Sequence, residues 1–157
     1  MNNTERFVKR FYKSIGITDP YLLTIENISQ KLRIKIIYWN YTSEIINYRN
    51  AYKLFLNENL NEQQQWVDFG HELGHYFCDN EDQSCLPKQY VNYQEYKADY
   101  FAYHFCIPTF MLLDLKGVTV YDVMQLFNVE FDFALKRLEM YKNKILERKM
   151  TYAGTYS

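Results

Sequence analysis

The sequence contains little glycine and proline, with 5 and 3 of these residues in a chain of 157. This scarcity argues against a turn-rich all-β fold and favours long helices. Neither charge sign dominates, because 18 Lys and Arg stand against 19 Asp and Glu. A broadly basic nucleic-acid binder and an acidic solvating tail are therefore both excluded.

Signals for a membrane or for secretion are also missing. The most apolar stretch, residues 101–115, is interrupted by His104, Pro108 and Asp114 and is too short to cross a bilayer. The polar start of the chain has no apolar signal-peptide core. The three cysteines are an odd number without a secreted framework, which predicts reduced thiols in a cytoplasmic protein; they are Cys78, Cys85 and Cys106.

What is present is a globular composition, with 48% hydrophobic and 24% charged residues. The length predicts a single domain, residues 1–157. Apolar periodicity predicts helices and a few strands. The expected helices cover residues 4–15, 19–31, 61–78, 89–106, 118–127 and 130–141, and the expected strands cover 32–39, 44–48 and 51–56. We therefore predict an α+β fold, mostly helical, with one small antiparallel or mixed sheet and a frayed tail from residue 149.

The third expected helix contains a motif that is typical of metal binding. His71-Glu72-Leu73-Gly74-His75 is an H-E-x-x-H string. Residues four apart lie about 40° apart around a helix, so both imidazoles can reach one ion. Glu72 is offset from them, where a carboxylate can take a proton from water activated by a metal. Gly74 suggests that another element approaches this helix closely.

A catalytic zinc site needs a third protein ligand. The downstream candidates are Asp79, Glu81, Asp82, Glu95, Asp99 and His104. The first three follow the motif too closely, whereas Glu95 lies in the next helix, which can return to the first. Asp99 shares the face of Glu95 and can orient a ligand histidine from behind, while His104 faces away. We therefore predict zinc bound by His71, His75 and Glu95, although manganese and iron also suit these ligands.

These residues resemble the ImmA/IrrE family of metallopeptidases. The family couples H-E-[LIF]-G-H to a later E-x-x-A-[ND]-x-F-A, and both are present here, the second as residues 95–102, followed by Pro108. One departure is Gly70, where alanine is more usual. The resemblance implies a zincin-like fold, with Glu72 as the general base. It also includes the strand Leu54-Phe55-Leu56-Asn57, which we expect to edge the cleft and pair with an extended substrate.

The resemblance further implies a protein substrate, commonly a helix-turn-helix repressor of a phage or mobile element, whose cleavage relieves repression. The alternative is a catalytically silent, peptidase-like module that sequesters a regulatory protein. Residues 118–141 have a helix-turn-helix outline, are expected to pack on the peptidase domain, and are a candidate docking surface for the repressor. Lys136 and Arg137 are offset there by Glu130, Asp132 and Glu139, which argues against direct DNA binding.

Overall fold

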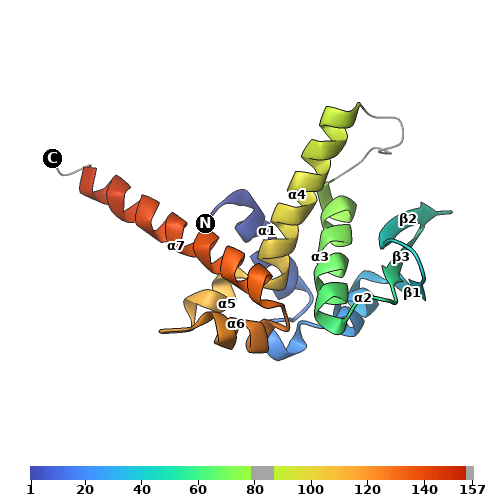
Figure 1. Cartoon of the computed structure of the whole chain (residues 1–157), viewed down its shortest axis with the longest axis horizontal. Helices are drawn as coiled ribbons and strands as arrows, with labels where there is room; N and C mark the ends of the chain where they lie inside the picture. Colours follow the sequence, from blue (N-terminus) through green and yellow to red (C-terminus); the bar gives the residue numbers. More distant parts are fainter. Residues whose placement is uncertain (79–86, 155–157) are drawn as a thin grey trace.

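The structure is a computed structural model that describes residues 1–78 and 87–154. Helices α3 and α4 lie side by side at its centre, with the sheet next to α3 and the end of α7 projecting away (Figure 1). In chain order the elements are α1 (Asn3–Ser14), η1 (Pro20–Leu22), α2 (Ile25–Leu32), β1 (Lys35–Trp39), β2 (Glu44–Tyr48), β3 (Ala51–Asn57), α3 (Glu62–Cys78), α4 (Lys88–Cys106), α5 (Thr109–Leu113), α6 (Val120–Phe127) and α7 (Phe131–Gly154). The predicted α+β class with a helical majority is confirmed.

The sheet of the described residues is mixed, with the strand order β1-β3-β2. Strand β1 runs parallel to β3, and β2 runs antiparallel to it. Arg49 and Asn50 join β2 to β3, and both have positive φ angles, of 51° and 61°. Two such residues are typical of a tight hairpin turn.

The position of β3 corrects one prediction. Leu54, Phe55, Leu56 and Asn57 lie in the central strand, whose two edges already pair with β1 and β2. Leu54 and Leu56 are also fully buried in the core. An extended substrate cannot add to this strand, and the prediction that it does so is wrong. The strand of this hairpin that has a free edge is β2.

Helices α3 and α4 approach each other closely because two positions of α3 have no side chain. A Cβ atom on Gly74 would lie 2.8 Å from the Ala98 Cα atom, and one on Gly70 would lie 2.9 Å from the Cys106 Sγ atom. The close approach that Gly74 suggested is therefore confirmed. Gly70 has a local explanation, because the Cys106 side chain fills the space that alanine would need.

Two helix boundaries differ from those expected. The segment 19–31 is divided, because Asp19 caps only the short turn η1, and Thr24 accepts a hydrogen bond from the Asn27 amide and starts α2. The last helix, α7, is 24 residues long and continues to Gly154. The segment 142–153 contains good helix formers and neither glycine nor proline, so the helix continues where a frayed tail was expected.

The C-terminal helices are part of the hydrophobic core. Val123, Phe127 and Ala134 are fully or almost fully buried. Arg137 is 1% exposed, and its Nε atom donates to the carbonyls of Tyr103 and Ile107 at the end of α4. The guanidinium therefore stabilises a helix C-terminus and is not available to DNA phosphates. No helix in the described ranges is long and apolar enough to cross a membrane.

Candidate metal centre

Helix α3 begins at an asparagine and carries the H-E-x-x-H motif in its second half. The Asn61 side chain accepts a hydrogen bond from the Gln64 amide at 2.8 Å, and the Gln64 side chain accepts one from the Asn61 amide at 3.2 Å. This reciprocal pair caps the helix. One turn apart on it, the Nε2 atoms of His71 and His75 lie 3.1 Å from each other. Both imidazoles therefore point their outer nitrogens at the same place.

Helix α4 brings a carboxylate to these two nitrogens. One Glu95 oxygen lies 3.1 Å from the His71 Nε2 atom, and the other lies 3.2 Å from the His75 Nε2 atom. Two ligands bound at 2.0–2.1 Å to a tetrahedral zinc ion are separated by roughly 3.3 Å. The spacing and chemistry of the three groups therefore fit one small divalent ion, with a fourth position left for water or substrate.

Asp99 lies behind His71, on the side opposite the candidate ion. Its Oδ1 atom lies 2.8 Å from the His71 Nδ1 atom. A carboxylate at this distance favours the tautomer with the proton on Nδ1, which leaves the Nε2 lone pair directed at the candidate metal position. The side chains of His71 and His75 are only 20% and 15% exposed, whereas that of Asp99 is 66% exposed.

Glu72 is buried beside the two histidines. It is 8% exposed, and its Oε2 atom accepts a hydrogen bond of 2.9 Å from the Ile45 amide of β2. Burial raises the pKa of the Glu72 carboxyl to about 7, against the opposing effects of the two histidines and of the Ile45 amide. A bound dication would stabilise the carboxylate and lower this pKa. The carboxyl group thus lies beside the two histidines, where it can accept a proton and return it.

Sequence reasoning missed the contacts that hold the sheet against α3. The Ser43 hydroxyl donates to Asp68 at 2.6 Å and accepts from the Asn57 amide at 3.0 Å. This clamp joins the ends of two strands to α3, one turn before the motif, and supports the Ile45 contact to Glu72. A main-chain amide has no sequence signal.

The other candidate ligands are separated from the centre or lie outside the described residues. His104 is 3% exposed, and neither of its ring nitrogens has a hydrogen-bond partner in the structure. It lies in the interior against the Tyr100 ring, with the centroids 4.7 Å apart. Asp79, Glu81 and Asp82, together with Cys85, lie outside the described residues.

The fold and the site together define a metallopeptidase-type protein of the α+β, zincin-like class. More particularly, the chain belongs to the peptidase M78 family, whose profile, described as the IrrE N-terminal-like domain, matches residues 29–139. The resemblance to the ImmA/IrrE family is thereby confirmed.

Two relatives and one solved structure are similar to the chain. The uncharacterized protein YqaB of Bacillus subtilis is 31% identical, and the match covers 98% of this chain and 92% of YqaB. The phage-like element PBSX protein XkdA of the same organism is 32% identical, with 92% and 75% covered. A Mycobacterium tuberculosis transcriptional regulator shares the fold, with a TM-score of 0.60 at 17% identity. That match covers 88% of this chain but only 47% of the regulator.

Proposed function

We propose that the protein is a zinc-dependent endopeptidase that hydrolyses a peptide bond in a specific protein. The observation that carries this proposal is the convergence of the His71, His75 and Glu95 ligand atoms, 3.1–3.2 Å apart, beside the buried Glu72. The substrate we propose is a helix-turn-helix repressor of a phage or mobile element, whose cleavage relieves repression. The phage-like element named for the relative XkdA supports this setting.

His71, His75 and Glu95 would hold the metal. When bound, a zinc ion supplies Lewis acidity, which lowers the pKa of water towards 7 and polarises a peptide carbonyl. Manganese and iron also accept two imidazoles and a carboxylate. Asp99 keeps the His71 ring oriented through its Nδ1 atom, so the ligand does not need to reorganise when the ion enters.

Glu72 would move the proton. As a carboxylate it takes a proton from the attacking water, and it then gives this proton to the nitrogen of the leaving amine. Its burial strengthens these interactions, because few water molecules compete for the carboxylate. The Ile45 amide fixes one of its oxygens at 2.9 Å, which leaves the other to face the reacting atoms.

We propose that an extended substrate pairs with β2, in place of the central strand β3. The Ile45 amide points away from β3, because it donates to Glu72 of α3. The free edge of β2 therefore faces the helix that carries the histidines. Main-chain pairing along this edge would hold a peptide in extended form across the centre.

The test is cleavage of a repressor encoded beside the gene, compared with an unrelated repressor, during co-expression. Native protein should cut only the first. Glu72→Gln should retain zinc and lose cleavage by on the order of 10²-fold or more. Equal digestion of both repressors would refute the specificity. Tight repressor binding without a cut, unchanged by Glu72→Gln, would instead show a peptidase-like binding module that sequesters its partner.

A further inference from the structure

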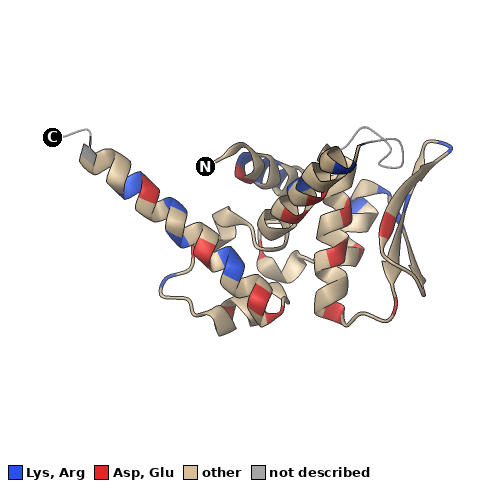
Figure 2. Ribbon diagram, turned by 45° about the horizontal axis from the view of Figure 1, so that its top comes forward, with Lys and Arg blue, Asp and Glu red and all other residues tan. Residues whose placement is uncertain are grey.

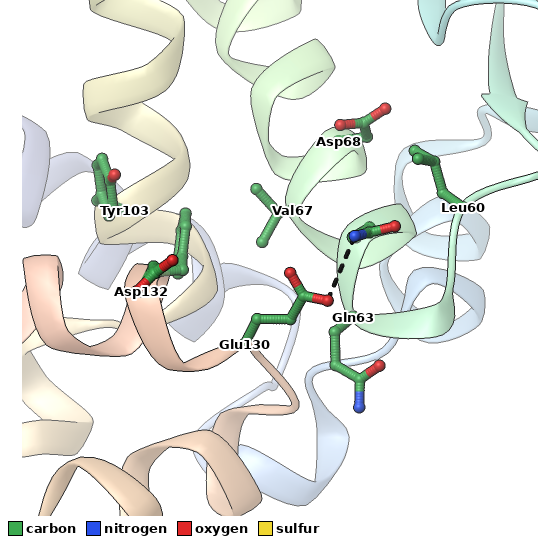
Figure 3. Close-up of a pocket in the computed structure, with 9 residues that line it drawn as sticks. Leu60, Gln63, Val67, Asp68, Tyr103, Glu130 and Asp132 are labelled. Carbon is green, nitrogen blue, oxygen red and sulfur yellow. Dashed lines mark hydrogen bonds between the residues drawn. The ribbon is translucent and has the colours of Figure 1, made fainter.

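A cavity of about 330 Å³ lies between α3, the end of α4 and the start of α7 (Figure 3). Its apolar walls come from Leu60 and Val67 on one side and from two aromatic rings on the other. These rings, of Tyr103 and Phe133, are stacked with their centroids 4.4 Å apart. The cavity is large enough to receive a long side chain.

The cavity lies one helical turn from the candidate metal centre along α3 and along α4. Val67 is one helical turn before His71, about 6 Å along the axis and on the same face of α3. Tyr103 is likewise one turn after Asp99 on α4, and Asp99 contacts His71. The two helices therefore present the ligands and the cavity on one face. A residue that flanks the bond held at the metal would have its side chain within reach of the cavity.

The polar part of the lining is acidic. Asp68, Glu130 and Asp132 contribute carboxylates, and no described residue of the lining is Lys, Arg or His. The contacts to Asp68 and Glu130 come from neutral donors, namely the Ser43 hydroxyl and two side-chain amides. These contacts leave the negative charges uncompensated. Acidic residues are visible on α3 and at the start of α7 in Figure 2.

Helix capping explains only part of this arrangement. Glu130 and Asp132 lie at the N-terminus of α7, where the helix dipole favours acidic residues. Asp68, however, lies inside α3 and lines the same cavity from another element. Carboxylates from two elements around an apolar floor favour a ligand with a hydrocarbon stem and a positive end.

We propose that this cavity is a specificity subsite for a lysine or arginine side chain next to the bond that is cleaved. The proposal rests on the proposed function, because it assigns a substrate preference to the same site. The aliphatic stem of the side chain packs against Val67 and the Phe133 ring. Its cationic end lies near Asp68 and Asp132, where charge attraction and the adjacent aromatic rings stabilise it.

Binding tests this subsite without requiring cleavage. The probes are an acetylated and amidated Ala-Ala-Lys-Ala-Ala peptide and the same peptide with norleucine in place of lysine. Each is titrated into the full chain carrying Glu72→Gln, and NMR shifts of the Val67 methyl groups report occupancy. We expect lysine to bind at least about fivefold more tightly, with the preference shrinking as salt screens the charges. Equal binding, or binding of neither peptide at millimolar concentration, would overturn the proposal.

Matched variants test whether the preference for lysine over norleucine arises in the cavity. Asp68→Asn combined with Asp132→Asn keeps the size of both side chains and the acceptor for Ser43, and it should reduce the lysine preference to less than twofold. Glu139→Gln removes one exposed charge from α7 outside the cavity and should leave the preference unchanged. A preference that survives the double substitution would place the recognition elsewhere.

A digest of a peptide mixture separates this proposal from the proposed function. Cut sites enriched in lysine or arginine beside the cleaved bond, and dependent on Glu72, support both. Cleavage without that enrichment keeps the peptidase and overturns the subsite. Lysine-selective binding by a zinc-loaded native protein that also leaves the repressor encoded beside the gene uncut keeps the binding preference and overturns the peptidase.

Discussion

Replacing Gly74 by alanine should destabilise the protein, although alanine is the better helix former. The added Cβ atom would lie 2.8 Å from the Ala98 Cα atom and 3.1 Å from its carbonyl oxygen. Carbon atoms normally approach to about 3.5 Å, so the helices must separate by roughly 0.7 Å, the difference between the two distances. Because the opposing atoms are backbone, no side-chain rotation can relieve the contact.

The expected magnitude follows from two opposing terms. Alanine gains about 1 kcal/mol over glycine in a helix interior. Overpacking costs about 1–3 kcal/mol, and a rigid backbone contact belongs at the upper end. We therefore expect the free energy of unfolding to fall by about 2 kcal/mol. Since His71 and Glu95 meet across the same helix pair, a separation of this size exceeds the roughly 0.5 Å that a preorganised site tolerates, so zinc affinity should also fall.

The assay is urea unfolding followed by circular dichroism, together with zinc titration by calorimetry. Gly70→Ala is the matched control, because its new atom would meet the Cys106 Sγ atom, a side chain, at 2.9 Å. In a background of Cys106→Ala most of the cost of Gly70→Ala should disappear, whereas the cost of Gly74→Ala should remain. A Gly74→Ala variant with native stability and native zinc affinity would refute this explanation of the helix packing.

Three further predictions concern single side chains. Asp99→Asn should lower the affinity for zinc by about 10–100-fold, and Glu95→Gln should lower it further. Equal losses of affinity in calorimetry would contradict the assignment of Glu95 as a metal ligand and of Asp99 as the residue that orients His71. Burial lowers the pKa of His104 from 6.5 to about 3 in the folded protein. Between these two pH values the unfolded chain therefore binds more protons than the folded chain. The free energy of unfolding should fall by up to about 1.4 kcal/mol per pH unit as the pH drops from 6.5 towards 3. His104→Phe should flatten that slope in urea midpoints measured at pH 5, 6 and 7, and an unchanged slope would exclude His104 as its source. Burial of Glu5 acts to raise its pKa, but hydrogen bonds from Lys144, the Asn2 amide and Thr109 outweigh this and hold it at about 2. Its stabilisation should therefore be present above pH 4.5 and lost towards pH 2, and Glu5→Gln should remove this acid-dependent part of the unfolding curve.

The elements around the centre were predictable from local pattern, and the contacts between distant elements were not. The periodicity of α3 and α4 indicated two helices, and the spacing of His71 and Glu95 allowed them to meet. The strand order β1-β3-β2 depends on long-range pairing, for which local sequence gives no direct signal. The contact from Ile45 to Glu72 comes from a main-chain amide, which has no sequence signal. The contact from Ser43 to Asp68 forms only because the sheet packs against α3.

In the C-terminal segment, too, the helices were predictable from local pattern and their contacts with other elements were not. Two helices were expected between residues 118 and 141, and α6 and α7 begin there as predicted. They were expected to pack on the peptidase domain and to offer a docking surface, and Phe127 and Ala134 are buried in the shared core. Removing the residues after Gly117 would therefore expose this core, so a loss of substrate binding in the shortened chain would not identify a docking surface. The segment's own pattern indicated two helices, but not which of their side chains the other elements bury.

Anomalous diffraction at the zinc edge, from crystals grown with equimolar zinc, would locate the metal ion among the side chains of the proposed centre. We expect one strong peak about 2.0–2.1 Å from the Nε2 atoms of His71 and His75 and bonded to a Glu95 oxygen. Data from Glu95→Gln crystals should show this peak weakened or absent while the two helices stay in place. A peak bonded to other residues, or none at this position with zinc at saturation, would contradict the proposed metal centre.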